Sequence, residues 1–424
     1  MSDVAPLHHH RRRMGGRDTR EPHRTATPLE LLFDLTFVVS FGFAASQFAH
    51  ALAEGHYSVA LIGFGFASFG ICWAWVNFSW FASAYDTDDW LYRLLTMAQM
   101  TGVLVLAIGI PRLFASLEHG GDALAGTHMD IGLMVLGYVV MRLALVLQWL
   151  RAARQDPARR RVCLTYVTAI VVAQIGWCAL ALFTPSLMLL APIWILLFLI
   201  ELAGPMIAER QQSGTPWHVH HIVERYMLFA IIALGEGVVG TVAALSAVVE
   251  AQGWSADTAL VAVAGIGLTF GLWWIYLMLP SAAVLQRFRQ RSFVWGYAQL
   301  LLITAIVAVG AGLHVAALLL EHKAHISAYA VVLSTAVPLI AFIALAYALY
   351  YHLMRRFDML HLLLLGLTLV TMVAAVIGAK AGASMPLCLL ILSLAPLITI
   401  IGYEWRGHRH QSEVLALQES RNDG

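Results

Sequence analysis

Charged residues are scarce in this sequence, and their scarcity excludes most classes of soluble protein. Asp, Glu, Lys and Arg together make up 12% of the 424 residues, whereas a soluble domain carries about 25%. Hydrophobic residues make up 60% and the mean hydropathy is +0.75, so the chain has too few polar residues to cover a soluble fold of this size. The composition therefore predicts a membrane protein with the lipid bilayer as its main partner, and we expect no nucleic acid partner.

Cysteine and catalytic motifs are also lacking. The four cysteines, Cys72, Cys163, Cys178 and Cys388, fall within or at the edges of apolar runs. They show neither the close spacing of a zinc site nor a pair in loops that would form a disulfide. The sequence also has no phosphate-binding loop, nicotinamide fingerprint or nucleophile motif. We therefore expect no cofactor, no bound metal and no enzymatic activity.

The sequence has instead a series of apolar runs, many near 20 residues long and separated by short charged loops. A helix needs about 20 apolar residues to cross a hydrocarbon core about 30 Å thick. The runs therefore predict an all-α polytopic membrane protein with about twelve transmembrane helices. These are placed at residues 29–52, 57–81, 91–115, 130–150, 162–183, 187–207, 226–249, 258–280, 294–320, 326–350, 359–378 and 385–403.

Basic residues separate the connecting segments into two groups. Lys and Arg accumulate in short cytoplasmic loops, and with the N-terminus inside, 22 of the 26 basic residues fall on the cytoplasmic side. Arg112, Lys323 and Lys380 fall outside, and Arg142 lies within a predicted helix. A miscounted helix would invert every later loop and spoil this separation. The pattern therefore predicts an even number of helices with both termini in the cytoplasm.

Polar segments precede, divide and follow the helical region. No apolar core follows the N-terminal arginines before Pro28, so the first segment is predicted to be a solvated arm rather than a cleavable signal, with Met14 as an alternative start. The predicted division is a cytoplasmic arm at 1–27, a first half at 28–208, a cytoplasmic linker at 209–225, a second half at 226–405 and a cytoplasmic tail at 406–424.

Four ionisable side chains interrupt the apolar runs at similar predicted depth. Glu236 follows Arg225 by eleven residues, or about 16 Å of helix, which places it near the middle of a membrane. By the same measure, Asp34, Arg142 and Glu201 lie about 12 to 15 Å into their helices. Such groups are costly in lipid unless they are paired, protonated or hydrated, so they mark candidate functional sites. We predict that these four form one cluster, whose surplus of negative charge is balanced by a proton or a cation.

Other polar residues lie at the predicted cytoplasmic ends of the helices. Glu30 is interpreted as a solvated acid in a first helical turn, where the helix dipole favours negative charge. Asp86, Asp88 and Asp89 are interpreted as caps of the next helix and as partners of Arg93 or of the basic loops. Oxygen ligation of a hard cation by these three aspartates is the alternative.

Histidine and aromatic residues gather at two further places. His218, His220 and His221 with Glu224 allow a metal site or a proton relay, but no defined zinc motif is present, so we favour residues of the membrane interface. The aromatic run FGICWAWVNFSWF at 69–81 is likewise typical of the aromatic belt at a membrane interface.

An internal repeat of about 200 residues is indicated. FGICWAWVN at 69–77 is similar to FGLWWIYLM at 270–278, and a displacement of 202 residues aligns Asp34 with Glu236. Six helices per repeat preserve the direction of the chain through the membrane. We therefore predict two parallel six-helix repeats, with Asp34 and Glu236 in corresponding positions.

Three motifs in fixed order resemble a known family. PLELLFDLTFVV begins at Pro28, DTDDWLYRLLTMAQM begins at Asp86, and VERYMLFAIIALGE begins at Val223. Through them, the chain from about residue 28 to 403 resembles the bacterial low temperature requirement protein A family. The resemblance implies a bacterial inner-membrane protein and a phenotype of growth in the cold, without implying a chemistry. The charged residues that occupy family-motif positions are Glu30, Asp34, Asp86, Asp88, Asp89, Arg93, Glu224, Arg225 and Glu236.

Acids inside the predicted helices favour a transport function. We expect a transporter of a small solute or ion that is coupled to protonation of Asp34 and Glu236, with Arg142 and Glu201 beside them. A cation channel, in which the same acids line or gate a pore, is the alternative. A membrane enzyme or a lipid-binding scaffold that uses the acidic cytoplasmic end is a further alternative.

Overall fold

A computed structural model describes residues 12–21, 24–119, 128–183, 187–211, 214–356, 359–409 and 411–412. Much of the predicted tail and the first part of the predicted arm lie outside these residues. Within the described chain, twelve candidate spans are long and apolar enough to cross a membrane. The predicted fold class, an all-α polytopic membrane protein, is thereby confirmed.

The helices follow one another with short connections. They are α1 (Pro28–Ala53), α2 (Tyr57–Tyr85), α3 (Trp90–Glu118), α4 (Gly132–Gln155), α5 (Arg160–Phe183), α6 (Leu187–Glu209), α7 (Val219–Gln252), α8 (Ala256–Leu277), α9 (Ser281–Arg287), α10 (Ser292–Leu320), α11 (Ala328–Met354), α12 (Met359–Lys380) and α13 (Met385–Gly402). The short α9 continues the span of α8, so the thirteen α-helices of the described chain make twelve candidate spans.

The start of α7 differs from the sequence prediction. The helix begins at Val219, seven residues before the predicted start at 226, so part of the predicted linker is helical. The prediction began the helix where the apolar run begins. The polar residues before that point nevertheless continue the helix, because His221 and Arg225 find buried acidic partners in α1.

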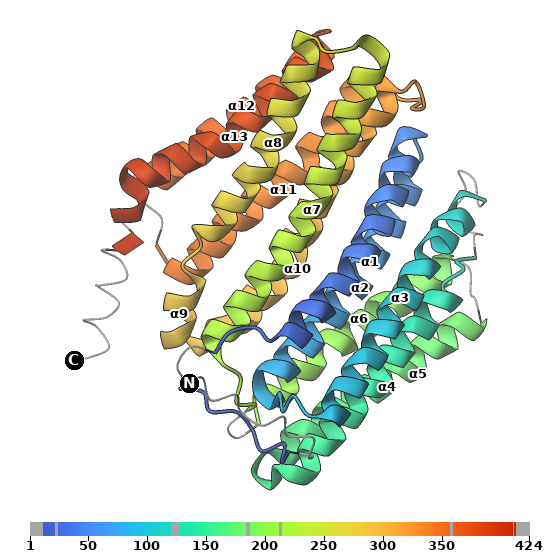
Figure 1. Ribbon diagram of the computed structural model, residues 1–424, viewed down its shortest axis with the longest axis vertical. Coiled ribbons are helices and arrows are strands. Elements are labelled where there is room, and N and C mark those ends of the chain that lie inside the picture. Colours follow the sequence, from blue (N-terminus) through green and yellow to red (C-terminus); the bar gives the residue numbers. More distant parts are fainter. Residues whose placement is uncertain are drawn as a thin grey trace, which may run out of the picture. The chain divides into compact units, whose positions relative to one another are not determined.

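The described chain divides into two compact units, which are drawn with the whole chain in Figure 1. Unit 1 comprises the described residues of Met1–Phe43 and Phe69–Arg225, and unit 2 comprises those of Ala44–Ser68 and Tyr226–Gly424. The end of α1 and the beginning of α2 therefore belong to unit 2, and the first two turns of α7 belong to unit 1. The division predicted from the sequence, with halves at 28–208 and 226–405, stays a prediction.

Each unit packs its helices in the order of the chain. In unit 1, α3 packs on α4, α4 on α5 and α5 on α6, and in unit 2, α10 packs on α11, α11 on α12 and α12 on α13. Aromatic rings of α2 and α6 meet at Phe69 and Phe198 in unit 1, and α8 packs on α13 in unit 2. These neighbours correspond if α1 to α6 are matched with the six spans that begin at α7. The six-helix repeat itself stays a prediction.

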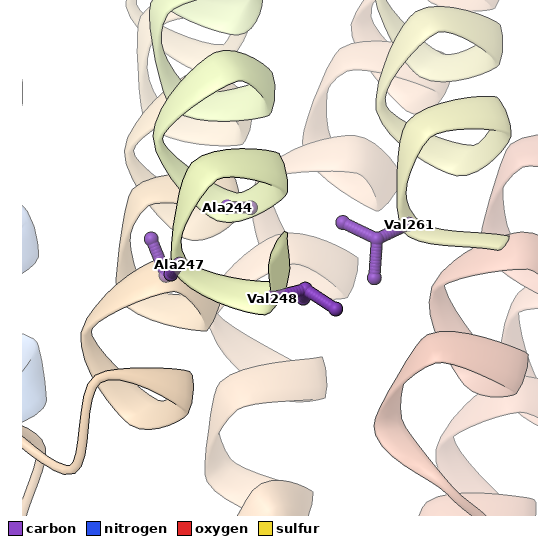
Figure 2. Close-up of a cluster of buried hydrophobic side chains, with 5 residues drawn as sticks. Ala244, Ala247, Val248 and Val261 are labelled. Carbon is purple, nitrogen blue, oxygen red and sulfur yellow. The ribbon is translucent and has the colours of Figure 1, made fainter. Parts of the chain in front are cut away.

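Small residues bring helices into close contact in both units. A Cβ atom on Gly102 of α3 would lie 2.6 Å from the carbonyl oxygen of Gly137 on α4, so only glycine fits there. In unit 2, Figure 2 shows Ala244, Ala247 and Val248 on α7 and Val261 on α8, and with Ala317 on α10 they form a buried apolar cluster. Small and β-branched side chains let these helices approach closely. Close approach increases the van der Waals contact between helices, which is the main attraction between them in lipid.

The N-terminal segment is exposed at several of its described residues, but it docks on the helices of unit 1 through Met14 and Arg24, where the prediction of a solvated arm is wrong. The Met14 amide donates a hydrogen bond to Oε1 of Gln155 at 2.6 Å, and the Met14 side chain is fully buried. Nη2 of Arg24 donates to the carbonyl oxygen of Ala82 at 2.8 Å. The Arg17 amide donates to the carbonyl oxygen of Ala84 at 2.9 Å. The last carbonyl groups of a helix have no partner within it, so this one at the end of α2 is available to the arm.

Candidate functional site

Unit 1 contains a buried ion pair between Asp34 of α1 and Arg225 of α7. Nη2 of Arg225 donates to Oδ1 of Asp34 at 2.7 Å, and Nε1 of Trp75 on α2 donates to the same oxygen at 2.7 Å. Arg225 also donates to Oγ of Ser79 at 3.3 Å. Asp34 is 1% exposed and Arg225 is 0% exposed. The pair is end-on, so Oδ2 of Asp34 and both Nε and Nη1 of Arg225 have no hydrogen-bond partner among the described residues.

One turn earlier in α1, Glu30 pairs with His221, which lies one turn before Arg225 in α7. Nε2 of His221 lies 3.2 Å from the Glu30 carboxylate, and both side chains are buried. Oε2 of Glu30 accepts hydrogen bonds from the amide and the hydroxyl of Thr27, while the Thr27 hydroxyl accepts from the Glu30 amide, which forms a capping box. Glu30 is therefore at the first turn as predicted, but the prediction that it is solvated is wrong.

Asp86 adds a third acid next to this region. It follows the last residue of α2 and is buried, and the charges of Glu30 and Arg24 act on it. The same charges, together with that of Arg225, act on the buried phenol of Tyr92 in α3. We call this set of residues the charge cluster. It consists of Arg24, Glu30, Asp34, Asp86, Tyr92, His221 and Arg225.

The charge cluster holds more acid than base. Its three carboxyl groups face two guanidinium groups, so with all acids ionised and His221 neutral its net charge is −1. Asp86 lies between two spans, and its pKa is raised to about 6. Burial is the main cause and repulsion by the Glu30 carboxylate the next, while attraction by Arg24 acts in the opposite direction. One proton taken up near neutral pH would balance the cluster.

Many polar atoms of the charge cluster are buried and have no hydrogen-bond partner among the described residues. Unpaired atoms of this kind are costly and rare in proteins, so their concentration in one place makes the charge cluster the candidate functional site. They are Nε and Nη1 of Arg24, Oε1 of Glu30, Oδ2 of Asp34, the hydroxyl of Tyr92, Nδ1 of His221, and Nε and Nη1 of Arg225.

Asp89 forms a second ion pair in unit 1, and its carboxylate is saturated with hydrogen bonds. Oδ1 accepts from Nη1 of Arg151 on α4 at 2.9 Å and from the Tyr92 amide at 2.9 Å, which caps α3 as predicted. Oδ2 accepts from Nη2 of Arg151 and from the Arg12 amide. Burial alone would raise the pKa of Asp89, but these hydrogen bonds outweigh burial and hold it below its ordinary value.

Asp88 forms an exposed pair with Arg93, which the sequence analysis named as a partner of this acidic run. Nε and Nη2 of Arg93 donate to the two carboxylate oxygens at 2.7 and 2.8 Å. The two side chains are 42% and 52% exposed, so water screens their attraction.

Arg142 of α4 pairs with Glu201 of α6 within unit 1. Nη2 of Arg142 donates to Oε2 of Glu201 at 2.9 Å, and Nε1 of Trp73 donates to the same oxygen at 2.9 Å. Oε1 of Glu201 accepts from the Tyr138 hydroxyl at 2.8 Å. Both charged side chains are buried, and Nε and Nη1 of Arg142 have no partner among the described residues.

Glu236 lies in unit 2, on the part of α7 that packs closely on α10. A Cβ atom on Gly310 of α10 would lie 2.6 Å from the backbone carbon of Glu236, and one on Gly237 would lie 2.7 Å from the Thr269 hydroxyl of α8. The Glu236 side chain is half-buried, and within the described chain it has no hydrogen bond or ion pair. Of the predicted cluster, Arg142 pairs with Glu201 and Asp34 pairs with Arg225 in unit 1, while the place of Glu236 in that cluster stays a prediction.

The histidine-rich segment at 218–224 contacts the N-terminal segment. Nε2 of His218 lies 3.0 Å from the carbonyl oxygen of Glu21, and His220 is exposed. Glu224 is half-buried and accepts a hydrogen bond from the Ala26 amide. Over the described ranges, no three side chains of His, Cys, Asp or Glu are grouped so that they would hold a metal ion.

Several residues of the site were not named by the sequence analysis. Trp73 and Trp75 were interpreted as interface residues, but both are fully buried and donate to acids, so that interpretation is wrong. Tyr138 is four residues from Arg142 and so shares its helix face, which is a signal that could have found it. Arg24 lies six residues from Glu30 and Tyr92 lies six residues from Asp86, so nearness to these acids in the sequence is a signal that could have found both.

The helices, their length and the charged pairs buried between them define a polytopic integral membrane protein with an ionisable interior. Residues 25–396 match the model of the family described as bacterial low temperature requirement A protein, and the chain belongs to that family. It is also similar to an uncharacterized protein of Rhizobium meliloti, with 26% identity over 256 residues. That alignment covers 58% of this chain and 57% of the relative, so the chain spans little more than half of the relative's length. No solved structure matches the chain.

Proposed function

We propose that the protein is a proton-linked transporter of a small solute or ion in the bacterial inner membrane, with both termini in the cytoplasm. The observation that carries this proposal is the buried end-on pair of Asp34 and Arg225, in which both partners keep unpaired polar atoms. A purely structural pair in such a place would be costly unless its remaining hydrogen bonds were made. The unpaired atoms are those that a solute or water would bind.

Proton uptake by the charge cluster would change what Arg225 binds. With Asp34 ionised, Arg225 is held by its carboxylate. Protonation of Asp34 removes that charge and leaves the guanidinium group to bind a solute that offers acceptor atoms. Asp86, which precedes α3 and has a pKa raised to about 6, is the group at which a proton enters.

Glu236 supplies a second carboxyl group for the transport cycle. It is half-buried within an apolar helix and has no basic partner in the described chain, so protonation removes most of the cost of keeping it there. A group of this kind favours one protonation state in lipid and the other in water, which is the property that couples a proton to movement of a solute.

The proposal is tested by reconstitution into liposomes with an imposed pH gradient and a panel of ions and small solutes. We expect saturable flux that reverses with the gradient and that falls by about tenfold or more, the equivalent of about 1.4 kcal/mol, in Asp34→Asn and in Glu236→Gln. In Glu236→Gln the remaining flux should lose its dependence on pH.

Asp88→Asn is the matched control, because it removes an exposed carboxylate from the same unit and should keep wild-type flux. Full, pH-dependent flux in both Asp34→Asn and Glu236→Gln would contradict the proposal. A current that rises linearly with concentration and does not saturate would favour the cation channel instead, and product formation without flux would favour an enzyme.

A further inference from the structure

Unit 2 contains a pocket at the end where α8, α11 and α13 finish and α12 begins. Its walls include Met278 after α8, Ala346 of α11 and Leu364 of α12. Because all of these residues lie within a few turns of helix ends, the pocket lies at the level where the hydrocarbon of a bilayer meets its headgroups.

Two of the polar side chains that line the pocket, Tyr347 and Thr399, are engaged with one another. The hydroxyls of Tyr347 and Thr399 lie 3.3 Å apart, and the Thr399 hydroxyl lies 3.0 Å from that of Thr368. The His361 ring stacks on Tyr350, with 4.7 Å between the ring centroids. The interior of the pocket is therefore suited to a hydrocarbon chain rather than to a ligand that needs many hydrogen bonds.

Exposed arginines follow the pocket on two of its helices. Arg355 caps α11 five residues after Tyr350, and Arg406 comes three residues after the pocket residue Tyr403. Both are exposed, and Arg406 lies over the ring of Trp405, which is 74% exposed. Among the described residues at this end, the exposed acid Glu404 accepts a hydrogen bond from Nε1 of Trp274 at 3.1 Å. Exposed tryptophan beside arginine is typical of residues at the headgroup level.

We propose that this pocket binds an anionic phospholipid, with one acyl chain between α8, α11 and α13 and with the phosphate group at Arg355 and Arg406. The apolar walls fit the chain, and the exposed arginines that follow the pocket residues of α11 and α13 in the sequence fit the headgroup. A zwitterionic lipid offers the same chain without net negative charge, so it should bind more weakly. This site is independent of the proposed transport function.

Native mass spectrometry of the purified full chain, titrated with phosphatidylglycerol or phosphatidylcholine, tests the proposal. We expect wild-type protein to retain phosphatidylglycerol in preference to phosphatidylcholine. The double variant Arg355→Asn with Arg406→Gln should lose about tenfold or more of its affinity for phosphatidylglycerol, with little change for phosphatidylcholine. Asn is chosen at 355 because the backbone there is left-handed, with φ of 56°, a conformation that Asn tolerates.

Ala346→Phe places a larger side chain in the pocket and should reduce binding of both lipids. Arg93→Gln, which removes an exposed arginine from unit 1, is the control and should bind both lipids as the wild type does. Equal affinity of the wild type for the two lipids, or unchanged phosphatidylglycerol binding in the double arginine variant, would overturn the proposal. The arginine variant changes exposed residues only, so it decides the matter even where Ala346→Phe fails to fold.

Discussion

Asp89 and Asp34 are both buried aspartates of unit 1 that pair with arginine, yet their surroundings differ. Asp89 meets Arg151 through two nitrogens and also accepts two backbone amides, so each carboxylate oxygen has two donors. Asp34 meets Arg225 through one nitrogen, and its second oxygen has no partner in the described chain. The Asp89–Arg151 arrangement favours a single conformation, because any movement of these side chains would break several hydrogen bonds. In the Asp34–Arg225 arrangement, each side chain keeps unpaired polar atoms, so it can form a new hydrogen bond when it loses an existing one.

Asp89→Ala should have the largest effect on stability. It removes the cap of α3 and strands the buried guanidinium of Arg151, which together should cost about 3 to 5 kcal/mol of the free energy of unfolding. Thermal unfolding of the purified protein in detergent measures this loss. The double variant Asp89→Ala with Arg151→Ala removes the stranded charge and should recover part of it. A single variant that unfolds at the wild-type temperature would contradict the structural role of this pair.

Asp86→Asn should change how stability depends on pH. Asp86 has its pKa raised from 3.8 to about 6, so as pH rises from about 4 to 6 the carboxyl ionises in the unfolded chain before it ionises in the folded protein. Wild-type stability should therefore fall over this range relative to Asp86→Asn, by on the order of 2 to 3 kcal/mol, and the difference should stay constant above about pH 6. Unfolding by denaturant at several pH values checks this, and parallel curves for the two proteins would show that Asp86 does not titrate as described.

The pH dependence from Asp89 has the opposite sign. Its pKa is held below the ordinary value, so the stability that it contributes is present above the pKa of the unfolded chain and is lost as pH falls through the lower pKa of the folded protein. The two aspartates, three residues apart, therefore favour the folded state at opposite ends of the acidic range.

Asp34→Asn should cost less stability than Asp89→Ala while it abolishes most flux. The amide oxygen of Asn still accepts the hydrogen bonds of Arg225 and Trp75, and the charge of Glu30 still acts on Arg225. We expect a loss of about 1 to 2 kcal/mol, measured in the same detergent as Asp89→Ala. A loss as large as that of Asp89→Ala would mean that Asp34 is as structural as Asp89, and the contrast between the two pairs would fail.

Asp88→Asn should have the smallest effect. Its pair with Arg93 is largely exposed, and exposed pairs contribute about 0 to 1 kcal/mol. The unfolding temperature should change little at low salt and not at all at high salt, where the attraction is screened. A large loss at both salt concentrations would reveal a contact of Asp88 beyond its ion pair.

The sequence allowed the fold class to be predicted, because apolar runs report directly on membrane spans. Asp34, Glu201 and Arg142 were found because charge inside an apolar run is conspicuous. Their partners were harder to find: Arg225 precedes an apolar run and was assigned to the cytoplasmic linker, although α7 begins at Val219, before it. Whether such a charge ends a span or enters the protein depends on acids 191 residues away, as Asp34 is from Arg225.

The N-terminal segment was misjudged for a related physical reason. Polar residues 12–27 resemble a solvated arm in every local property, and acceptor groups at the end of α2, such as the carbonyl of Ala84, make docking favourable. Trp73 and Trp75 were misjudged because an indole ring suits both an interface and a buried acid. In each case the side chain's partner, which local sequence does not report, decides its role.

The docking of Met14 on Gln155 also bears on the order in which the protein assembles. The two residues are separated by 141 positions, and the chain is made from its N-terminus, so Met14 is synthesised long before α4 exists. Arg24 can bind the carbonyl oxygen of Ala82 once α2 has been made, but Met14 has no partner until the end of α4 has been made. Contacts between residues so distant in sequence form late and slowly. Burial of Met14 would thus report, during biosynthesis, that the first four helices of the chain have come together.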